Sequence, residues 1–160
     1  MAASASAGAG GKYVNLSGVY ELDRDASDKI SIFLKEAGFS WATRSMADMM
    51  GLTLTVQHTE DGFTGTGKTS VGTGTYVLEV GKACPYDMGG SIMMLTSKHT
   101  EDGRFESVGA LPNDKDRKVI MYHGKGGEDN PDGLLVMTHV HDKEGKETHV
   151  IKRVLRAKAK

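Results

Sequence analysis

A single helical stretch, residues 30–50, constrains the fold most, because the rest of the sequence has the pattern of short strands and turns. Its first part carries apolar side chains at i, i+3, i+4 and i+7, the stripe of an amphipathic helix: Ile30, Phe33, Leu34 and Ala37. Ser27 is available as the N-terminal cap, and Gly38 is predicted to end the helix. The stripe therefore predicts a short helix with one buried face.

A second helix is predicted directly after the first. Ser40 can cap it, and Gly51 ends the helical pattern. Its apolar side chains again share one face: Ala42, Met46, Met49 and Met50. Each apolar face has to be buried against another element, and the remaining sequence offers only a sheet. We therefore expect two short helices that cover a β structure.

Turn sequences recur between β-patterned segments along the rest of the chain. The pentapeptide His-Thr-Glu-Asp-Gly begins at His58 and again at His99, and we interpret both copies as hairpin turns. Short antiparallel strands without helices between the later ones favour an up-and-down barrel or a sandwich, because closure removes exposed sheet edges. Pro85 cannot donate to a ladder, which predicts a break between the fourth and fifth strands. The ten predicted strands are 18–24, 52–58, 63–69, 75–81, 82–86, 91–99, 104–110, 118–123, 134–141 and 148–155.

Length and composition predict one domain in a reducing compartment. The 160 residues suit a single core, and we predict a disordered tail over 1–12, one barrel domain over 13–156 and a basic tail over 157–160. Lys plus Arg number 20 and Asp plus Glu 21, so no net field attracts nucleic acid. A single cysteine, no apolar run of membrane-spanning length and no signal-peptide pattern predict a cytoplasmic protein.

The segment from Gly62 to Thr69 matches the phosphate-binding pattern G-x-x-x-x-G-K-[ST]. Phosphate binding by this pattern requires a helix that begins at the Lys-Thr pair, where backbone amides hold the phosphates. The residues after Thr69 include two glycines and several β-branched residues and have no helical stripe. We interpret the match as accidental and expect no nucleotide site.

The histidines do not assemble a predicted metal site. His139 and His141 share one strand face, but a two-residue turn after them pairs Val140 with His149 and places His149 on the other face. A three-residue loop would reverse that placement. No set of metal ligands with suitable spacing results, so we expect no metal and no cofactor. Cys84 is interpreted as a packed thiol, because the sequence indicates no partner that would activate it.

Arg153 is the strongest candidate for a ligand contact. Strand alternation puts it on one face with Ile151 and Leu155. If this face points inward, a guanidinium in an apolar interior needs an anionic partner, for which a ligand carboxylate is suitable. An outward arginine, or one paired with an internal Asp or Glu, is the alternative. Thr138 on the neighbouring strand would line the same interior.

Three segments carry motifs of one known family. Residues 18–22, GVYEL, fit G-x-[FYW]-x-[LIVMF]; residues 34–44, LKEAGFSWATR, are close to M-K-E-x-G-x-x-x-A-T-R; and residues 134–155 form a closing hairpin that ends in KRVL. On these motifs the chain resembles the intracellular lipid-binding proteins, which include the fatty-acid-binding and cellular retinoid-binding proteins of the calycin superfamily. The resemblance extends from Gly18 to about Leu155.

The resemblance implies a mainly β fold, a ten-stranded antiparallel up-and-down β-barrel (β-clam) capped by a helix-turn-helix. It implies a gap at Pro85 and an internal cavity that binds hydrophobic molecules reversibly, without catalysis. The ligand would enter near the second helix. The candidate residues around this entry are Ile30, Met46, Ala47 and Val71.

The chain also departs from the family pattern. The family commonly ends in R-x-Y, whose Arg and Tyr hold the ligand carboxylate, and here Arg153 matches while Leu155 replaces the tyrosine. The second family arginine falls on or near Tyr122, and residues 28–29 are Asp-Lys in place of an aromatic-acidic pair. The usual carboxylate clamp is therefore half present.

Our hypothesis from the sequence is a monomeric cytosolic carrier for a long-chain fatty acid or similar ligand. Arg153 would pair with the acidic head group, Tyr122 or Thr138 would add hydrogen bonds, and Ile151 and Leu155 would line the site. The helical lid would open for exchange and could contact a membrane transiently. The alternatives are a neutral or cyclic ligand, such as a retinoid, bile acid or pigment, and a protein-interaction module without a ligand.

Overall fold

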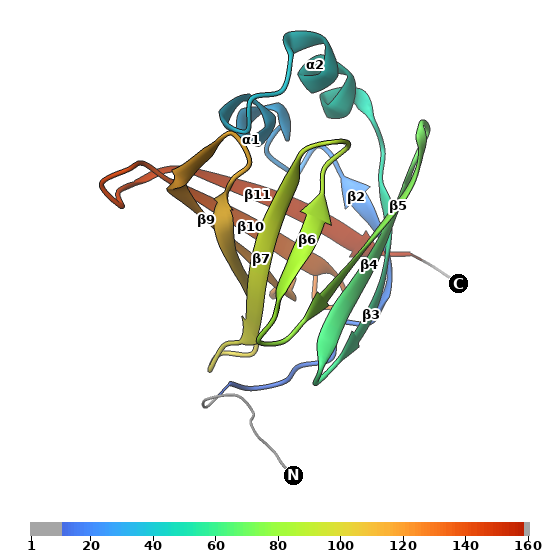
Figure 1. The fold of residues 1–160 in the computed structure, drawn as a ribbon. Helices are drawn as coiled ribbons and strands as arrows, with labels where there is room; N and C mark the ends of the chain where they lie inside the picture. The colour runs from blue at the N-terminus through green and yellow to red at the C-terminus, as the bar shows by residue number, and fades with distance from the viewer. Residues whose placement is uncertain (1–10, 159–160) are drawn as a thin grey trace.

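The computed structural model describes residues 11–158, and residues 1–10 and 159–160 lie outside the described part of the chain. The chain folds into a curved sheet with two short helices across one end (Figure 1). The helices are α1 (Ser31–Glu36) and α2 (Trp41–Met49). The strands are β2 (Gly18–Asp23), β3 (Thr53–Thr59), β4 (Gly62–Thr69), β5 (Gly72–Glu79), β6 (Ala83–Asp87), β7 (Ile92–His99), β8 (Phe105–Leu111), β9 (Asp114–Lys125), β10 (Leu134–His141) and β11 (Glu147–Ala157).

The ten strands form one antiparallel sheet that curls into a nearly closed barrel. Their order is β5-β4-β3-β2-β11-β10-β9-β8-β7-β6, so that the fourth and fifth strands of the chain, β5 and β6, stand at the two edges. Pro85 lies in β6, where it faces Met94 of β7. An edge strand tolerates a residue without an N–H, and the predicted break at Pro85 is confirmed. The predicted mainly β, ten-stranded up-and-down clam is also confirmed.

Side-chain alternation divides every strand into an inward and an outward set. The segment that matches the phosphate-binding pattern is strand β4, with an alternating burial pattern and no helix after it, as predicted. Phe63 of β4 packs against Phe105 of β8 with 5.2 Å between ring centroids, and both rings are fully buried. These rings and the aliphatic side chains around them fill the end of the barrel opposite the helices.

Helix α1 is buried along the predicted stripe, since Phe33, Leu34 and Ala37 belong to the core. Gly38 follows its last turn with φ +89°, the left-handed conformation that ends a helix without strain in glycine. The predicted cap at Ser27 is wrong. The Ser27 hydroxyl instead donates to the Asp23 carbonyl oxygen at 2.6 Å and accepts from the Val154 amide at 2.8 Å, which ties this loop to β11.

Helix α2 is capped as predicted but faces the other way. The Ser40 hydroxyl accepts from the Thr43 amide at 3.3 Å. However, Met46 and Met49 are 54% and 76% exposed, and none of the residues of α2 is buried. The predicted burial of this methionine face is therefore wrong, because polar contacts orient the helix: Arg44 donates to the Phe39 carbonyl oxygen at 2.7 Å, and Asp48 accepts from the Ser31 amide at 2.9 Å.

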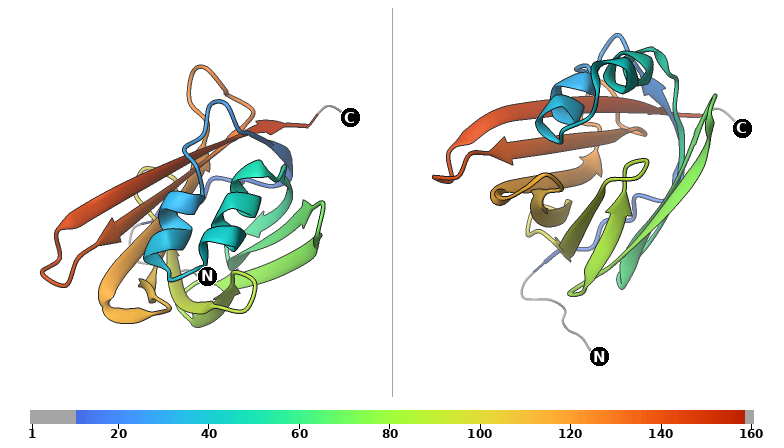
Figure 2. Two further views of the ribbon diagram at one scale, coloured as in Figure 1. Left: turned by 90° about the horizontal axis from the view of Figure 1, so that it is seen from above. Right: turned by 45° about the horizontal axis from the view of Figure 1, so that its top comes forward.

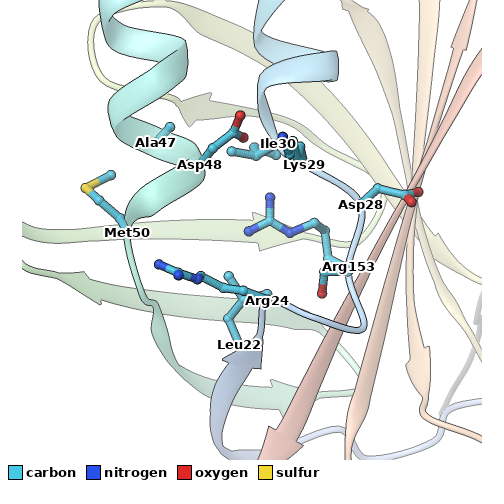
Figure 3. Close-up of a pocket in the computed structure, with 10 residues that line it drawn as sticks. Leu22, Arg24, Asp28, Lys29, Ile30, Ala47, Asp48, Met50 and Arg153 are labelled. Atoms are coloured by element: carbon cyan, nitrogen blue, oxygen red, sulfur yellow. The ribbon is translucent and has the colours of Figure 1, made fainter.

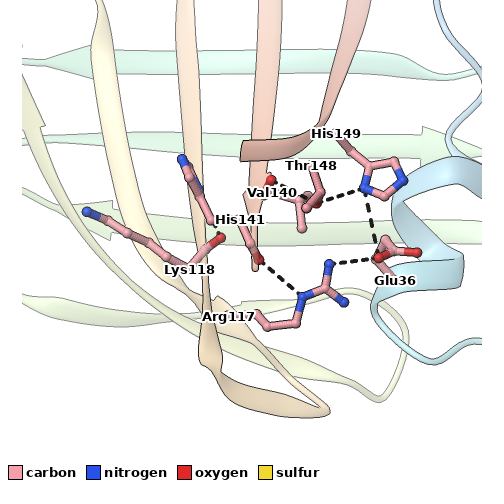
Figure 4. A network of polar contacts seen from close by, with 7 residues as sticks. All are labelled: Glu36, Arg117, Lys118, Val140, His141, Thr148 and His149. Atoms are coloured by element: carbon pink, nitrogen blue, oxygen red, sulfur yellow. Dashed lines mark hydrogen bonds and ion pairs between the residues drawn. The ribbon is translucent and has the colours of Figure 1, made fainter. Parts of the chain in front are cut away.

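An ion pair fastens α1 to the barrel rim. Glu36 Oε1 lies 2.7 Å from Arg117 Nη2 at the start of β9 and 3.9 Å from His149 Nδ1 of β11 (Figure 4). Arg117 Nε also donates to the His141 carbonyl oxygen at 3.1 Å. Three strands of the rim thus hold the end of α1. The end of α2 also has a contact with the barrel, since the Arg24 guanidinium, directly after β2, donates to the Met49 carbonyl oxygen, and Figure 2 shows α2 lying across the barrel mouth.

The opposite end of the barrel is covered by the segment before β2. Leu16 is fully buried, and its amide donates to His58 Nδ1 at 3.1 Å. His58 Nε2 lies 3.0 Å from His99 Nε2, so the two histidines of the repeated pentapeptide meet at this end. The predicted tail over residues 1–12 lies outside the described residues except for Gly11 and Lys12, and the Lys12 amide donates to the Thr100 carbonyl oxygen at 2.8 Å.

The last hairpin has the register of the first of the two alternatives, with a longer connection. Val140 pairs with His149, as expected from a two-residue turn. The connection is in fact the five residues 142–146, and a bulge between Val140 and His141 restores the register. His149 therefore lies on the inward face with Val140, whereas His139, the strand neighbour of Val140, lies on the outward face. In the described chain no group of three or more His, Cys, Asp or Glu side chains is arranged to hold a metal ion.

Candidate ligand-binding site

Arg153 points into the barrel from β11. Its strand neighbours of the same parity, Ile151 and Leu155, are 1% and 2% exposed and belong to the core. Its Cα partner on β10 is Val136, which also packs against the core. Of the two orientations that the sequence left open, the inward one is observed.

The guanidinium of Arg153 is incompletely paired. Nη1 is buried and has no hydrogen-bond partner among the described residues. Burial lowers the pKa of Arg153, and the charges of Asp48, Tyr86 and Asp28 act in the opposite direction. An unpaired buried N–H of a cation costs free energy that an incoming anionic or hydrogen-bonding group can recover.

A small pocket lies beside this guanidinium, beneath the helices. Its volume is about 40 Å³, which is room for about three water molecules. Figure 3 shows the Arg153 guanidinium extending beneath the helices, and Ile30 lies between it and Asp48, whose carboxylate points toward the start of α1. The pocket is lined by residues of β2, the loop before α1, α2 and β11: Leu22, Arg24, Ser27, Asp28, Lys29, Ile30, Ala47, Asp48, Met50 and Arg153. A long acyl chain requires several hundred Å³, so this space must widen to admit one.

The structure brings together only part of the predicted site. Thr138 is inward and 7% exposed, and its Cα partner is Ile151. Ile30 and Ala47 line the pocket with Arg153. Met46 and Val71 do not, since both are exposed, the first on the outer face of α2 and the second in the turn that joins β4 to β5.

Tyr122 lies on the outer face of the barrel. Its ring is 4.0 Å from the guanidinium carbon of Arg104 and 5.5 Å from the His139 ring centroid. Its Cα partner on β8 is Glu106, which forms an ion pair with the exposed Lys98. Tyr122 is therefore separated from Arg153 by the sheet itself.

The inward residue at this level of β9 is His123. Val136 is the Cα partner of both His123 and Arg153. The two polar residues therefore lie at the same level of the sheet, one on each side of Val136, and their side chains point inward. His123 is 2% exposed, and its Nδ1 has no hydrogen-bond partner among the described residues. Burial lowers the pKa of His123 to about 4, and the imidazole is neutral at physiological pH. Alternation along β9, with Val119 and Met121 inward, could have identified it from the sequence.

Two tyrosines of the sheet edges face the same interior. Tyr76 of β5 and Tyr86 of β6 pack with 4.8 Å between ring centroids, across the line where the sheet is open. Burial raises the pKa of both hydroxyls, and the charge of Arg153 acts on Tyr86 in the opposite direction. Alternation around Pro85 could have placed Tyr86 inward. The interior therefore holds a phenol near Arg153 although the family tyrosine is replaced by Leu155.

Cys84 is buried in β6. Its sulfur accepts from the Glu79 amide at 3.3 Å, and its thiol lies 3.6 Å from the Lys82 carbonyl oxygen. These contacts fix the corner between β5 and β6. They match the predicted packed thiol.

The fold defines a class of protein, the β-clam, a nearly closed ten-stranded barrel capped by a helix-turn-helix. Similar solved structures include human cRBP IV (TM-score 0.70, 21% identity, 91% of this chain and 99% of that chain). A Schistosoma mansoni fatty acid binding protein in complex with arachidonic acid is also similar (TM-score 0.71, 14% identity, 90% and 96%). So is the fatty-acid-binding protein isolated from Manduca sexta (TM-score 0.67, 18% identity, 91% and 100%).

The chain therefore has the fold of the intracellular lipid-binding proteins, over nearly its whole length. No protein-family model and no curated protein matches the sequence. Among the described residues, neither helix has the length and hydropathy needed to span a bilayer.

Proposed function

We propose that the protein is a non-catalytic intracellular carrier that binds a long-chain fatty acid or a similar hydrophobic ligand inside the barrel. The observation that carries this proposal is the buried Nη1 of Arg153, which has no hydrogen-bond partner among the described residues. A ligand carboxylate would supply the missing acceptor, and its tail would cover apolar side chains of the interior. The similar structures described as a fatty acid transporter and as fatty-acid-binding proteins support this choice of ligand.

Tyr86, Thr138 and His123 are the proposed hydrogen-bonding partners of the ligand. All three are on the inner face, and His123 Nδ1 has no partner among the described residues. Tyr86 takes the place of the tyrosine that Leu155 replaces. Tyr122, on the outer face, has no part in this proposal.

The lid formed by α1 and α2 is the proposed entry. The pocket beside Arg153 is too small for an acyl chain, so a ligand can enter only if the lid moves. Helix α2 is the proposed moving part, because none of its residues is buried, and its movement would break the hydrogen bonds of Asp48 with Ser31 and of Met49 with Arg24. Its exposed Trp41, Met46 and Met49 would let the open lid contact a membrane transiently.

A neutral or cyclic ligand is the second candidate. The absence of the family tyrosine and the neutral state of His123 favour a head group that accepts or donates hydrogen bonds without a charge. Mass spectrometry of the lipid that copurifies with the protein distinguishes the two candidates. An acid supports the first, and an alcohol, sterol-like molecule or pigment supports the second.

The arginine test compares two variants of the delipidated protein. Arg153→Ala is expected to weaken the binding of a long-chain acid by about 1.5 to 3 kcal/mol, roughly ten- to a hundredfold. Binding of the corresponding alcohol is expected to weaken much less. Arg156→Ala is the matched control, because Arg156 pairs with Asp23 at 2.8 Å on the outer face. Equal loss of acid and alcohol in Arg153→Ala would remove Arg153 from the proposed role.

A further inference from the structure

Asp48 joins the two helices of the lid. It lies near the end of α2, and its Oδ1 accepts a hydrogen bond from the Ser31 amide at 2.9 Å. Ser31 is the first residue of α1, and the cap residue Ile30 offers no side-chain acceptor to this helix end. Asp48 therefore supplies from α2 the acceptor that the start of α1 lacks.

The same residue lines the candidate ligand site. Asp48 lines the pocket beside Arg153, and Figure 3 shows it above the Arg153 guanidinium with its carboxylate turned toward the start of α1. They form no ion pair within 4.0 Å, because Asp48 is held by Ser31. Burial lowers the pKa of Arg153, and nearby negative charges oppose this shift because they favour the charged guanidinium. The charge of Asp48 has the largest of these opposing effects.

Asp28, the other carboxylate of the pocket, is already engaged with the barrel wall. Its Oδ2 accepts from the Lys152 amide at 2.8 Å, and its own amide donates to the Lys152 carbonyl oxygen at 2.8 Å. It belongs to the loop before α1 and is fixed to β11. Asp48 is therefore the acidic side chain on the movable helix that a head group at Arg153 would meet.

We propose that Asp48 is a specificity-determining residue, a built-in counter-charge that disfavours anionic head groups at Arg153 relative to neutral ones and so sets the balance between acids and alcohols. This inference rests on the proposed function. A carboxylate bound to Arg153 shares the pocket with the Asp48 carboxylate and is repelled by it. A hydroxyl head group can accept from Arg153 and donate to Asp48, so it meets no such penalty.

The proposal predicts a selective gain in Asp48→Asn. The amide keeps the Oδ1 acceptor for Ser31 and removes the charge. Like-charge repulsion over a few ångströms in a partly solvated pocket predicts about fivefold tighter binding of hexadecanoic acid. Binding of hexadecanol is expected to stay within about twofold, because a neutral head group does not experience that repulsion.

The experiment titrates delipidated wild type, Asp48→Asn and the control Asp25→Asn with both ligands. Each variant is read by displacement of a neutral fluorophore whose own affinity is measured for that variant. Asp25 is exposed in the loop after β2 and does not line the pocket, so the ratio of acid to alcohol affinity should stay at the wild-type value. The Ser31 amide resonance and the melting temperature report whether the contact between the helices persists.

The outcomes separate this inference from the proposed function. An acid-to-alcohol affinity ratio that rises about fivefold in Asp48→Asn alone supports the role of Asp48. If acid and alcohol change by one common factor in Asp48→Asn, Asp48 acts only through the lid structure, and the inference is overturned. If wild type binds neither ligand, the carrier function itself fails.

Discussion

The histidines at the base of the barrel predict a strong loss of stability in mild acid. His58 Nδ1 accepts from the Leu16 amide at 3.1 Å, and its Nε2 lies 3.0 Å from His99 Nε2. One proton lies between the two Nε2 atoms, so the pair is satisfied only when both rings are neutral. A further proton breaks either the contact between the rings or the bond to Leu16.

His123 provides the magnitude of the effect. It is fully enclosed, its Nδ1 has no partner among the described residues, and its pKa in the folded protein is about 4, against 6.5 for an unperturbed histidine. Because the folded pKa is lowered, the stabilisation is present above pH 6.5 and is lost as the pH falls toward 4. By this linkage, His123 alone lowers the free energy of unfolding by about 2 kcal/mol at pH 5 and by about 3 kcal/mol below pH 4, relative to neutral pH.

The assay is urea unfolding of wild type and His123→Phe at pH 7.5 and pH 5. The phenylalanine replaces the titrating ring in an aromatic environment, 4.6 Å from the Phe63 ring centroid in the native protein. When the pH is lowered from 7.5 to 5, the free energy of unfolding of the variant should fall by about 2 kcal/mol less than that of wild type, whatever its value at pH 7.5. His141→Gln, which changes a histidine exposed at the rim, should keep the wild-type pH dependence. Equal pH dependence in wild type and His123→Phe would refute the reasoning.

Two further predictions concern the lid and the wall. Arg117→Ala removes the ion pair that holds Glu36 and should speed hydrogen exchange of the α1 amides severalfold, measured by mass spectrometry, whereas unchanged exchange would contradict the anchoring role. Gly65→Ala places a Cβ 2.3 Å from the Tyr76 ring and should cost about 1 to 3 kcal/mol in urea unfolding. Gly74→Ala on the neighbouring strand has nothing within 4 Å and should be close to neutral, so equal costs for the two glycines would contradict the packing of Tyr76.

Strand alternation put Arg153 on one face with Ile151 and Leu155, but both faces of this strand carry apolar residues, so the sequence left open which face points inward. The register of the last hairpin was likewise left open between two loop lengths. Alternation also explains why Tyr122 lies on the outer face, away from Arg153. A change of one residue along a strand changes the face, so the inward neighbour of Tyr122 is His123.

Features that depend on long-range contacts could not be predicted from the sequence. The methionine face of α2 has the pattern of a buried stripe, yet it faces solvent, because Asp48 accepts from the Ser31 amide and Arg44 donates to the Phe39 carbonyl oxygen. The repeated pentapeptide was recognised as two turns, but the meeting of His58 with His99 arises only when the barrel closes. The contact of Tyr86 with Tyr76 likewise exists because the curled sheet brings its two edges together.

The most direct test of the central claim is calorimetric titration of the delipidated protein with a long-chain fatty acid. The account predicts saturable binding of one or two molecules per chain, with a negative heat-capacity change because apolar surface is buried in the barrel. It also predicts that Arg153→Ala binds the acid at least tenfold more weakly while Arg156→Ala binds it as wild type does. Absence of saturable binding, or equal affinities in the two arginine variants, would contradict the account.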